Sequence, residues 1–209
     1  MISRSVFVSI FKNAADTIIA AKDELTAIDA KFGDADHGIT MEKVSRAFRG
    51  AMDGEGSFKS LMENAAAAIM TINGGSAVPL WNTFFEGFAN GLDDLIEAAG
   101  PEELSEAAFK QMFASALEEM NGITRAKVGD KTMMDALIPG AQAILNSPSD
   151  DLKEVLNAGA DAAQNGAAAT VNFVSKYGRA KSYKEATIGT MDCGAMSMML
   201  FFAGLNSNQ

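Results

Sequence analysis

The chain has 209 residues, of which 48% are hydrophobic and 21% are charged, and its formal net charge is −10. This composition excludes an intrinsically disordered chain, and a globular chain of this size buries roughly 70% of the surface that its unfolded form exposes. The negative charge argues against a nucleic-acid partner, because such a partner requires a basic surface that displaces counterions from phosphates.

The chain contains one cysteine, Cys193, which excludes an internal disulfide and suits a reducing compartment. No apolar run approaches the roughly 18 to 20 residues that a membrane helix needs. The N-terminal segment, residues 1–12, lacks a signal-peptide cleavage pattern. We therefore expect a soluble cytoplasmic protein without a membrane partner.

Hydrophobic residues recur at three- and four-residue steps along nearly the whole chain, which predicts helices. The first stripe consists of Val6, Ile10, Ala14, Thr17, Ile18, Ala21, Leu25 and Ile28. A second helix is predicted to begin at Pro101, with Glu102 and Glu103 in its first turn and Gly122 as its C-terminal cap. Residues 148–151 predict another start, followed by a stripe from Leu152 to Tyr177, and a last apolar helix is predicted over 196–205.

No segment shows convincing alternation of apolar and polar residues, so strands are not expected. The sequence predicts one all-α domain over residues 1–209, with about eight antiparallel amphipathic helices in an up-and-down arrangement. Glycine, aspartate and threonine gather in four breaks between the stripes, at 29–41, 73–83, 125–135 and 178–197. Alternate junctions of such a bundle share one end, so these four loops are expected to form one site.

The first break contains three carboxylates within eight residues, Asp29, Asp34 and Asp36, beside two glycines. A cation is expected to neutralise them, and oxygen ligands favour Mg²⁺ or Ca²⁺. An EF-hand is excluded, because Ser45 occupies the position of its bidentate glutamate when Asp34 is counted first. Magnesium completed by ligand phosphates fits better. A solvated turn, with an aspartate that caps the next helix, is the alternative.

The other breaks give weaker signals. Gly74-Gly75-Ser76 indicates either a helix N-terminus that binds phosphate or a tight turn between helices. Residues 129–135 fit a plain helix entry capped by Thr132 or Asp130, and the Walker glycine spacing is missing. Arg179 would suit a phosphate or a ribose, because its charge is permanent. Cys193 is interpreted as a buried unreactive thiol, and His37 as a capping or packing residue.

In order and spacing, these segments match one family. They are Gly33-Asp34-Ala35-Asp36-His37-Gly38, Gly74-Gly75-Ser76 with Thr83-Phe84-Phe85, Gly129-Asp130-Lys131-Thr132-Met133, Gly178-Arg179-Ala180, and Ile188-Gly189 through Asp192 with Gly194-Ala195. The chain resembles, over almost its whole length, the L subunit of dihydroxyacetone kinase, a DAK2-type nucleotide-binding domain.

The resemblance implies an eight-helix barrel with Mg-bound ADP or ATP in the loops at one end. It implies two Mg²⁺ ions held by Asp29, Asp34 and Asp36, which would also be the catalytic residues. The nucleotide contacts it implies are His37, Gly38, Thr40, Gly75, Ser76, Ala77, Thr83, Gly129, Thr132, Met133, Arg179, Asp192 and Gly194. The sugar would be held by a separate K subunit.

The resemblance leaves several alternatives open. The donor is either free ATP or a phosphotransferase-system protein that rephosphorylates bound ADP, and the acceptor is dihydroxyacetone or another small ketose. A homodimer is also open. The sequence departs from the family at Thr40, where asparagine is usual, and at residues 190–193, where Thr-Met-Asp-Cys replaces His-Gln-Asp-Pro. The altered residues 190–193 motivate the rival interpretation, a nucleotide-sensing or regulatory module without catalysis. A third interpretation is a purely structural helical bundle that binds no nucleotide.

Overall fold

The computed structural model describes residues 1–92 and 102–207, and within these ranges the chain is mostly helical. The α-helices are α1 (Arg4–Ala20), α2 (Lys22–Asp29), α3 (His37–Ala51), α4 (Phe58–Met70), α5 (Ala77–Asn90), α7 (Glu106–Ile123), α8 (Met134–Asn146), α9 (Leu152–Ala169) and α10 (Cys193–Asn206). Two 3-10 segments, η1 (Thr170–Asn172) and η2 (Arg179–Thr187), follow α9. The all-α prediction is confirmed.

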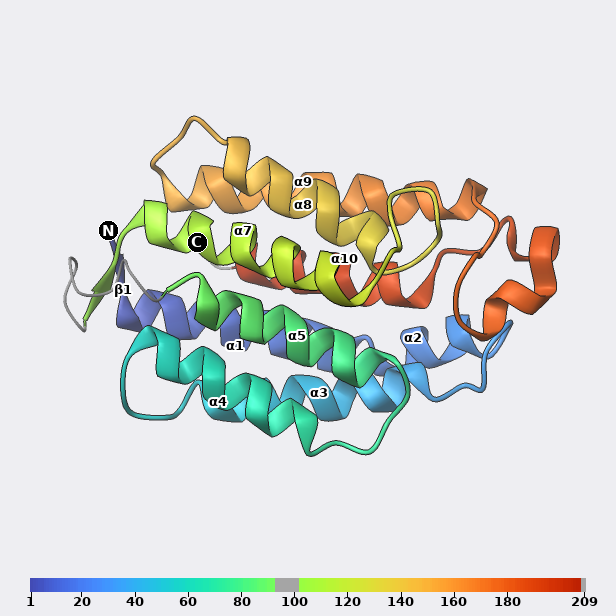
Figure 1. Cartoon of the computed structure of the whole chain (residues 1–209), viewed down its shortest axis with the longest axis horizontal. Coiled ribbons are helices and arrows are strands. Elements are labelled where there is room, and N and C mark those ends of the chain that lie inside the picture. The colour runs from blue at the N-terminus through green and yellow to red at the C-terminus, as the bar shows by residue number, and fades with distance from the viewer. Residues whose placement is uncertain (93–101, 208–209) are drawn as a thin grey trace.

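The helices form a closed ring in which neighbours run antiparallel (Figure 1). The helix pairs in contact around the ring are α1 with α3, α3 with α4, α4 with α5, α5 with α7, α7 with α8, α8 with α9, α9 with α10, and α10 with α1. Helix α2 continues α1 after a break at Ala21, so the described residues form eight rods, as predicted. The return of α10 to α1 makes the bundle a barrel.

Aromatic side chains fill the interior of the barrel. Phe201 of α10 is fully buried, and its ring centroid lies 5.3 Å from that of Phe84, 5.7 Å from that of Trp81 and 6.1 Å from that of Phe11. Burying one such side chain stabilises a fold by about 1.5 to 3 kcal/mol. This cluster therefore joins α1, α5 and α10 in the interior of the barrel.

One predicted helix start differs from the structure. Pro101 lies outside the described residues, and α7 begins at Glu106, where the Ser105 side chain accepts a hydrogen bond from the Ala108 N–H. Glu103 and Leu104 instead form the short strand β2 (Glu103–Leu104), which pairs with β1 (Ile2–Ser3) in antiparallel register. The expectation of no strands was wrong for this two-residue pair, because contact with the N-terminal segment outweighs the local helical pattern.

Of three further predicted helix ends, one agrees with the structure and two differ from it. Asp151 caps α9 as expected, with its carboxylate accepting from the Lys153 N–H at 2.8 Å. Gly122 lies inside α7, which continues to Ile123, so its predicted role as a cap was wrong. The last helix begins three residues earlier than predicted, at Cys193, since the Asp192 carboxylate caps it.

Among the helices in the described part of the chain, none combines the length and the apolar character that crossing a membrane requires.

Candidate functional site

Helices α3, α5, α8 and α10 all begin at the same end of the barrel (Figure 1, right). The loops that meet there cover residues 30–36, 71–76, 124–133 and 170–192, which confirms the prediction that alternate junctions share one end. A helix N-terminus carries partial positive charge and free N–H groups. Four such termini at one place form an environment that favours an anion.

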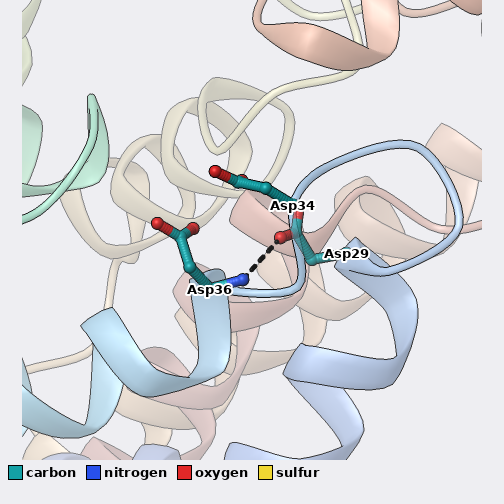
Figure 2. A group of neighbouring side chains, drawn as sticks. All are labelled: Asp29, Asp34 and Asp36. Atoms are coloured by element: carbon teal, nitrogen blue, oxygen red, sulfur yellow. Dashed lines mark hydrogen bonds between the residues drawn. The ribbon is translucent and has the colours of Figure 1, made fainter.

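The three aspartates of the first loop come together at this end. One carboxylate oxygen each from Asp29, Asp34 and Asp36 lie within 4.8 Å of one another. Asp34 and Asp36 extend to the same side of the loop, and the Asp29 carboxylate faces the Asp36 N–H (Figure 2). Asp29 is partly exposed, and Asp34 and Asp36 are exposed, so a ligand can reach the cluster from solvent.

Asp29 is fixed by the backbone of the loop that it helps to build. It is the last residue of α2, and its Oδ2 accepts hydrogen bonds from the N–H groups of Asp36 at 3.1 Å and His37 at 3.4 Å (Figure 2). Ala35 supports this tight return with a left-handed φ of 59°. An aspartate that caps the next helix, as the solvated-turn interpretation requires, is therefore present. This aspartate is Asp29, and the carboxylates of Asp34 and Asp36 remain available to bind a cation.

The electrostatics of the cluster favour a bound cation. The pKa of Asp36 is raised, first by burial and then by the neighbouring Asp34 and Asp29 carboxylates, while Arg179 lowers it. Two oxygens bound to one Mg²⁺ lie at most about 4 Å apart, because each sits about 2 Å from the ion. The three carboxylates are close to this spacing, so the donor set fits magnesium after small side-chain rotations.

Beside the aspartates lies a cavity of about 270 Å³. The predicted site residues that line it are Asp29, Asp34, Asp36, His37, Thr40, Gly75, Ser76, Ala77, Thr132, Met133, Arg179, Asp192 and Gly194. Their roles in binding stay predictions, but the structure brings them around one space. Two of the lining residues form an ion pair, in which Arg179 Nη2 lies 2.6 Å from Asp34 Oδ2.

Three predicted nucleotide contacts do not line the cavity. Gly38 faces α2, where a Cβ atom would lie 2.1 Å from the Lys22 carbonyl oxygen. Thr83 is buried along α5. Gly129 adopts a φ of 95° and donates its N–H to the Asp135 carboxylate at 2.6 Å, so it shapes a turn.

Cavity residues that the sequence did not single out as binding residues complete the walls. They are Ile28, Phe32, Gly33, Leu80, Trp81, Lys131, Ser175, Tyr177, Gly178, Ala180, Thr190, Met191 and Cys193. Several are apolar or aromatic, and in the sequence they are indistinguishable from core residues. Only their place beside glycine-rich breaks, as for Tyr177 before Gly178, could have indicated them.

The histidine and the cysteine of the site are both perturbed by burial. Burial lowers the pKa of His37, against the opposing effect of Asp29, so the imidazole is neutral near pH 7. Its Nε2 lies 3.2 Å from Ser197 Oγ. Burial raises the pKa of Cys193 far above its usual range, and its Sγ lies 3.7 Å from Asp29 Oδ1. This environment agrees with the prediction that Cys193 is an unreactive thiol.

Asp192 gives the site a pH dependence that can be measured. Burial raises the pKa of its carboxyl to about 7. The folded chain thus holds this proton more tightly than the unfolded chain, whose aspartates titrate near pH 4. The free energy of unfolding should therefore decrease as pH rises from about 4 through about 7.

We expect Asp192→Asn to remove this part of the pH dependence of the unfolding free energy, because asparagine retains the cap on α10 but does not titrate. Thermal melts of the nucleotide-free protein between pH 5 and pH 8 check the prediction. The melting temperature of the wild type should fall more over this range than that of the variant. Parallel curves for the two proteins would contradict it.

Comparison with known proteins gives one family. The DAK2 domain model matches residues 31–207. The ADP-binding subunit DhaL of the PEP-dependent dihydroxyacetone kinase of Escherichia coli is 28% identical over 204 residues, which cover 95% of this chain and 93% of that protein. A D-erythrulose kinase of Mycolicibacterium smegmatis is 33% identical over 91% of this chain, but only 33% of that protein is covered.

A solved structure agrees with these sequence matches. The dihydroxyacetone kinase from C. freundii, in complex with AMP-PNP and Mg²⁺, superimposes with a TM-score of 0.70 and 25% sequence identity. The match covers 97% of this chain and 33% of that protein, so this chain spans about a third of the kinase. Together with the family model, which covers most of the sequence, this shows that the chain belongs to the DAK2 domain family.

Proposed function

We propose that this chain is the nucleotide-binding subunit of a dihydroxyacetone kinase. It would hold Mg-bound ADP or ATP in the cavity at the end of the barrel and supply the phosphoryl group to dihydroxyacetone held by a separate K subunit. The observation that carries the proposal is the convergence of Asp29, Asp34 and Asp36 beside a cavity at which four helix N-termini meet.

The residues of this chain divide the binding task by charge. The start of α5, at Ser76 and Ala77, offers backbone N–H groups to phosphate oxygens. Leu80 and Trp81 form an apolar wall that suits a purine ring. The three aspartates would hold magnesium, which neutralises phosphate charge when bound and thereby favours phosphoryl transfer.

In the transfer itself, the bond between the γ-phosphorus and the bridging oxygen breaks while a bond to the sugar hydroxyl oxygen forms. The hydroxyl proton must leave on the side of the sugar, which this chain would not bind. The one histidine of this chain, His37, lines the cavity with its Nε2 3.2 Å from Ser197 Oγ, so it belongs to the proposed nucleotide site. This supports a division of labour with a second subunit.

Exposed apolar side chains support docking at the nucleotide end. Among the described residues, all the large exposed hydrophobic side chains except Met1 belong to the loops or helix turns at that end: Ile39, Met70, Ile123, Val128, Tyr177, Tyr183 and Ile188. Apolar side chains gathered on one face are typical of interaction surfaces. A K subunit that covers this end would also exclude water from the cavity.

Calorimetry with ADP, in the presence of Mg²⁺ and then of EDTA, tests nucleotide binding. Product analysis with a K-type partner, ATP, Mg²⁺ and either dihydroxyacetone or erythrulose tests the reaction and the ketose. A phosphate ester supports the kinase subunit, and Mg-ADP binding without turnover supports the nucleotide-sensing module. Slow loss of bound ADP during dialysis would favour rephosphorylation by a phosphotransferase-system protein over exchange with free ATP.

A further inference from the structure

Lys131 is a buried cation whose hydrogen-bond partners, among the described residues, are all backbone carbonyls. The residue is 3% exposed, and its Nζ lies 2.7 Å from the Thr170 oxygen, 3.1 Å from that of Phe173, 2.8 Å from that of Thr187 and 2.6 Å from that of Thr190. An ammonium group has three N–H donors, so four oxygens saturate it. Four converging carbonyls are the arrangement that also suits a bare monovalent cation.

The backbone is bent to place this side chain. Lys131 adopts a left-handed φ of 62°, which is unfavourable for a residue with a Cβ atom. Such a conformation persists only where surrounding contacts compensate for it. The insertion of Lys131 is therefore a built feature of the loop between α7 and α8.

The carbonyl cage closes the base of one segment, residues 173–192, which we call the strap. Phe173 lies at its beginning, and Thr187 and Thr190 lie near its end. Between these anchors the strap carries Tyr177 and Arg179 to the cavity, and Arg179 pairs there with Asp34. One buried ammonium thus ties together both ends of a loop that forms one wall of the site.

The position of Lys131 directly before Thr132 is what a phosphate-binding lysine would show, but the geometry argues otherwise. Every N–H of the ammonium is engaged by the cage, on the strap side of the loop. We propose that Lys131 is a positioning residue, with its ammonium group acting as a built-in monovalent cation that holds the strap in the shape nucleotide binding needs. Only the nucleotide readout of this proposal rests on the proposed function.

The strap is tested first without nucleotide. Trypsin cleaves after Arg179 and Lys184, which are both exposed in the strap. Lys131→Met, which keeps the length of the side chain but leaves buried carbonyls unpaired, should be cleaved there about tenfold faster than the wild type. The matched control is Lys181→Met, the same change at an exposed strap lysine, which should leave cleavage at Arg179 and Lys184 unchanged. Equal cleavage of Lys131→Met and the wild type overturns the proposal.

Cation rescue separates a cage from a merely structural side chain. Lys131→Gly keeps a backbone that tolerates the left-handed φ and empties the cage. Ammonium or potassium chloride should restore the slow cleavage and the Mg-ADP affinity of this variant, whereas tetramethylammonium chloride at equal ionic strength should not. An identical response to all three salts would contradict the proposal that the carbonyl cage holds a monovalent cation.

Two results keep the test decisive. If the variants do not fold, reductive methylation of the wild type replaces them: Lys131 should stay unmodified while Lys181 reacts, and equal modification overturns the proposal. If the wild type itself does not bind Mg-ADP, the proposed function fails, and the cleavage experiment still decides the role of Lys131.

Discussion

Asp34→Asn is expected to weaken Mg-ADP binding about 100-fold, a loss of about 3 kcal/mol. The exposed Asp34 carboxylate has an ion pair with Arg179 and takes no part in holding the loop backbone, whereas Asp29 does. Removing its charge should therefore remove a magnesium ligand and leave the fold intact. Calorimetry at saturating Mg²⁺ measures the affinity, and a thermal melt should show a melting temperature close to that of the wild type.

The same titration in EDTA distinguishes a metal ligand from a residue that shapes the loop. Without Mg²⁺, the variant should bind ADP at least as well as the wild type, because one repulsive charge beside the phosphates is gone. The matched control is Asp53→Asn, an exposed aspartate paired with Lys12 far from the cavity, which should change neither titration. An equal loss with and without Mg²⁺ would contradict the assignment of Asp34 to the metal.

Gly38→Ala is expected to destabilise the fold by about 1 to 3 kcal/mol and to weaken Mg-ADP binding as well. The new Cβ atom would lie 2.1 Å from the Lys22 carbonyl oxygen and 2.2 Å from Thr26 Oγ1, so α3 must move away from α2. That movement separates Asp36, at the start of α3, from Asp29, at the end of α2. Denaturant unfolding and calorimetry measure the two effects.

Gly50→Ala, near the other end of the same helix, is the control. A Cβ atom at Gly50 meets nothing within 4 Å, so alanine should stabilise α3 by about 0.5 to 1 kcal/mol through helix propensity alone. If Gly38→Ala kept full stability but lost nucleotide affinity, Gly38 would be a ligand contact, as the family resemblance implies, and the packing explanation would be wrong.

The sequence predicted what depends on local pattern. The stripe from Val6 to Ile28 gave the helices that become α1 and α2, and the glycine- and aspartate-rich breaks gave the loops that meet at the cavity. Antiparallel order was enough to place these loops together. Family resemblance then named thirteen of the residues that line the cavity, which spacing alone leaves ambiguous.

What the sequence could not predict depends on contacts between distant segments. The strand at Glu103 exists because β1 lies beside it, and nothing local to residues 101–105 indicates that. The role of Lys131 depends on carbonyls 39 to 59 residues further along the chain. The resemblance implies that Gly38 and Gly129 contact the nucleotide, and nothing in the sequence indicates that Gly38 packs against α2 and that Gly129 shapes a turn.

Closure of the ring by α10 has a consequence for synthesis on the ribosome. The segment from Asp29 to His37 meets α10 through Cys193 beside Asp29 and through Ser197 beside His37, two residue pairs separated by 164 and 160 positions. At about 5 to 20 residues per second, the α10 partners of this segment are translated roughly 8 to 33 seconds after it. A nascent chain that ends before α10 therefore lacks one wall of the cavity, and under the proposed function nucleotide would stabilise the chain only once translation has passed that helix.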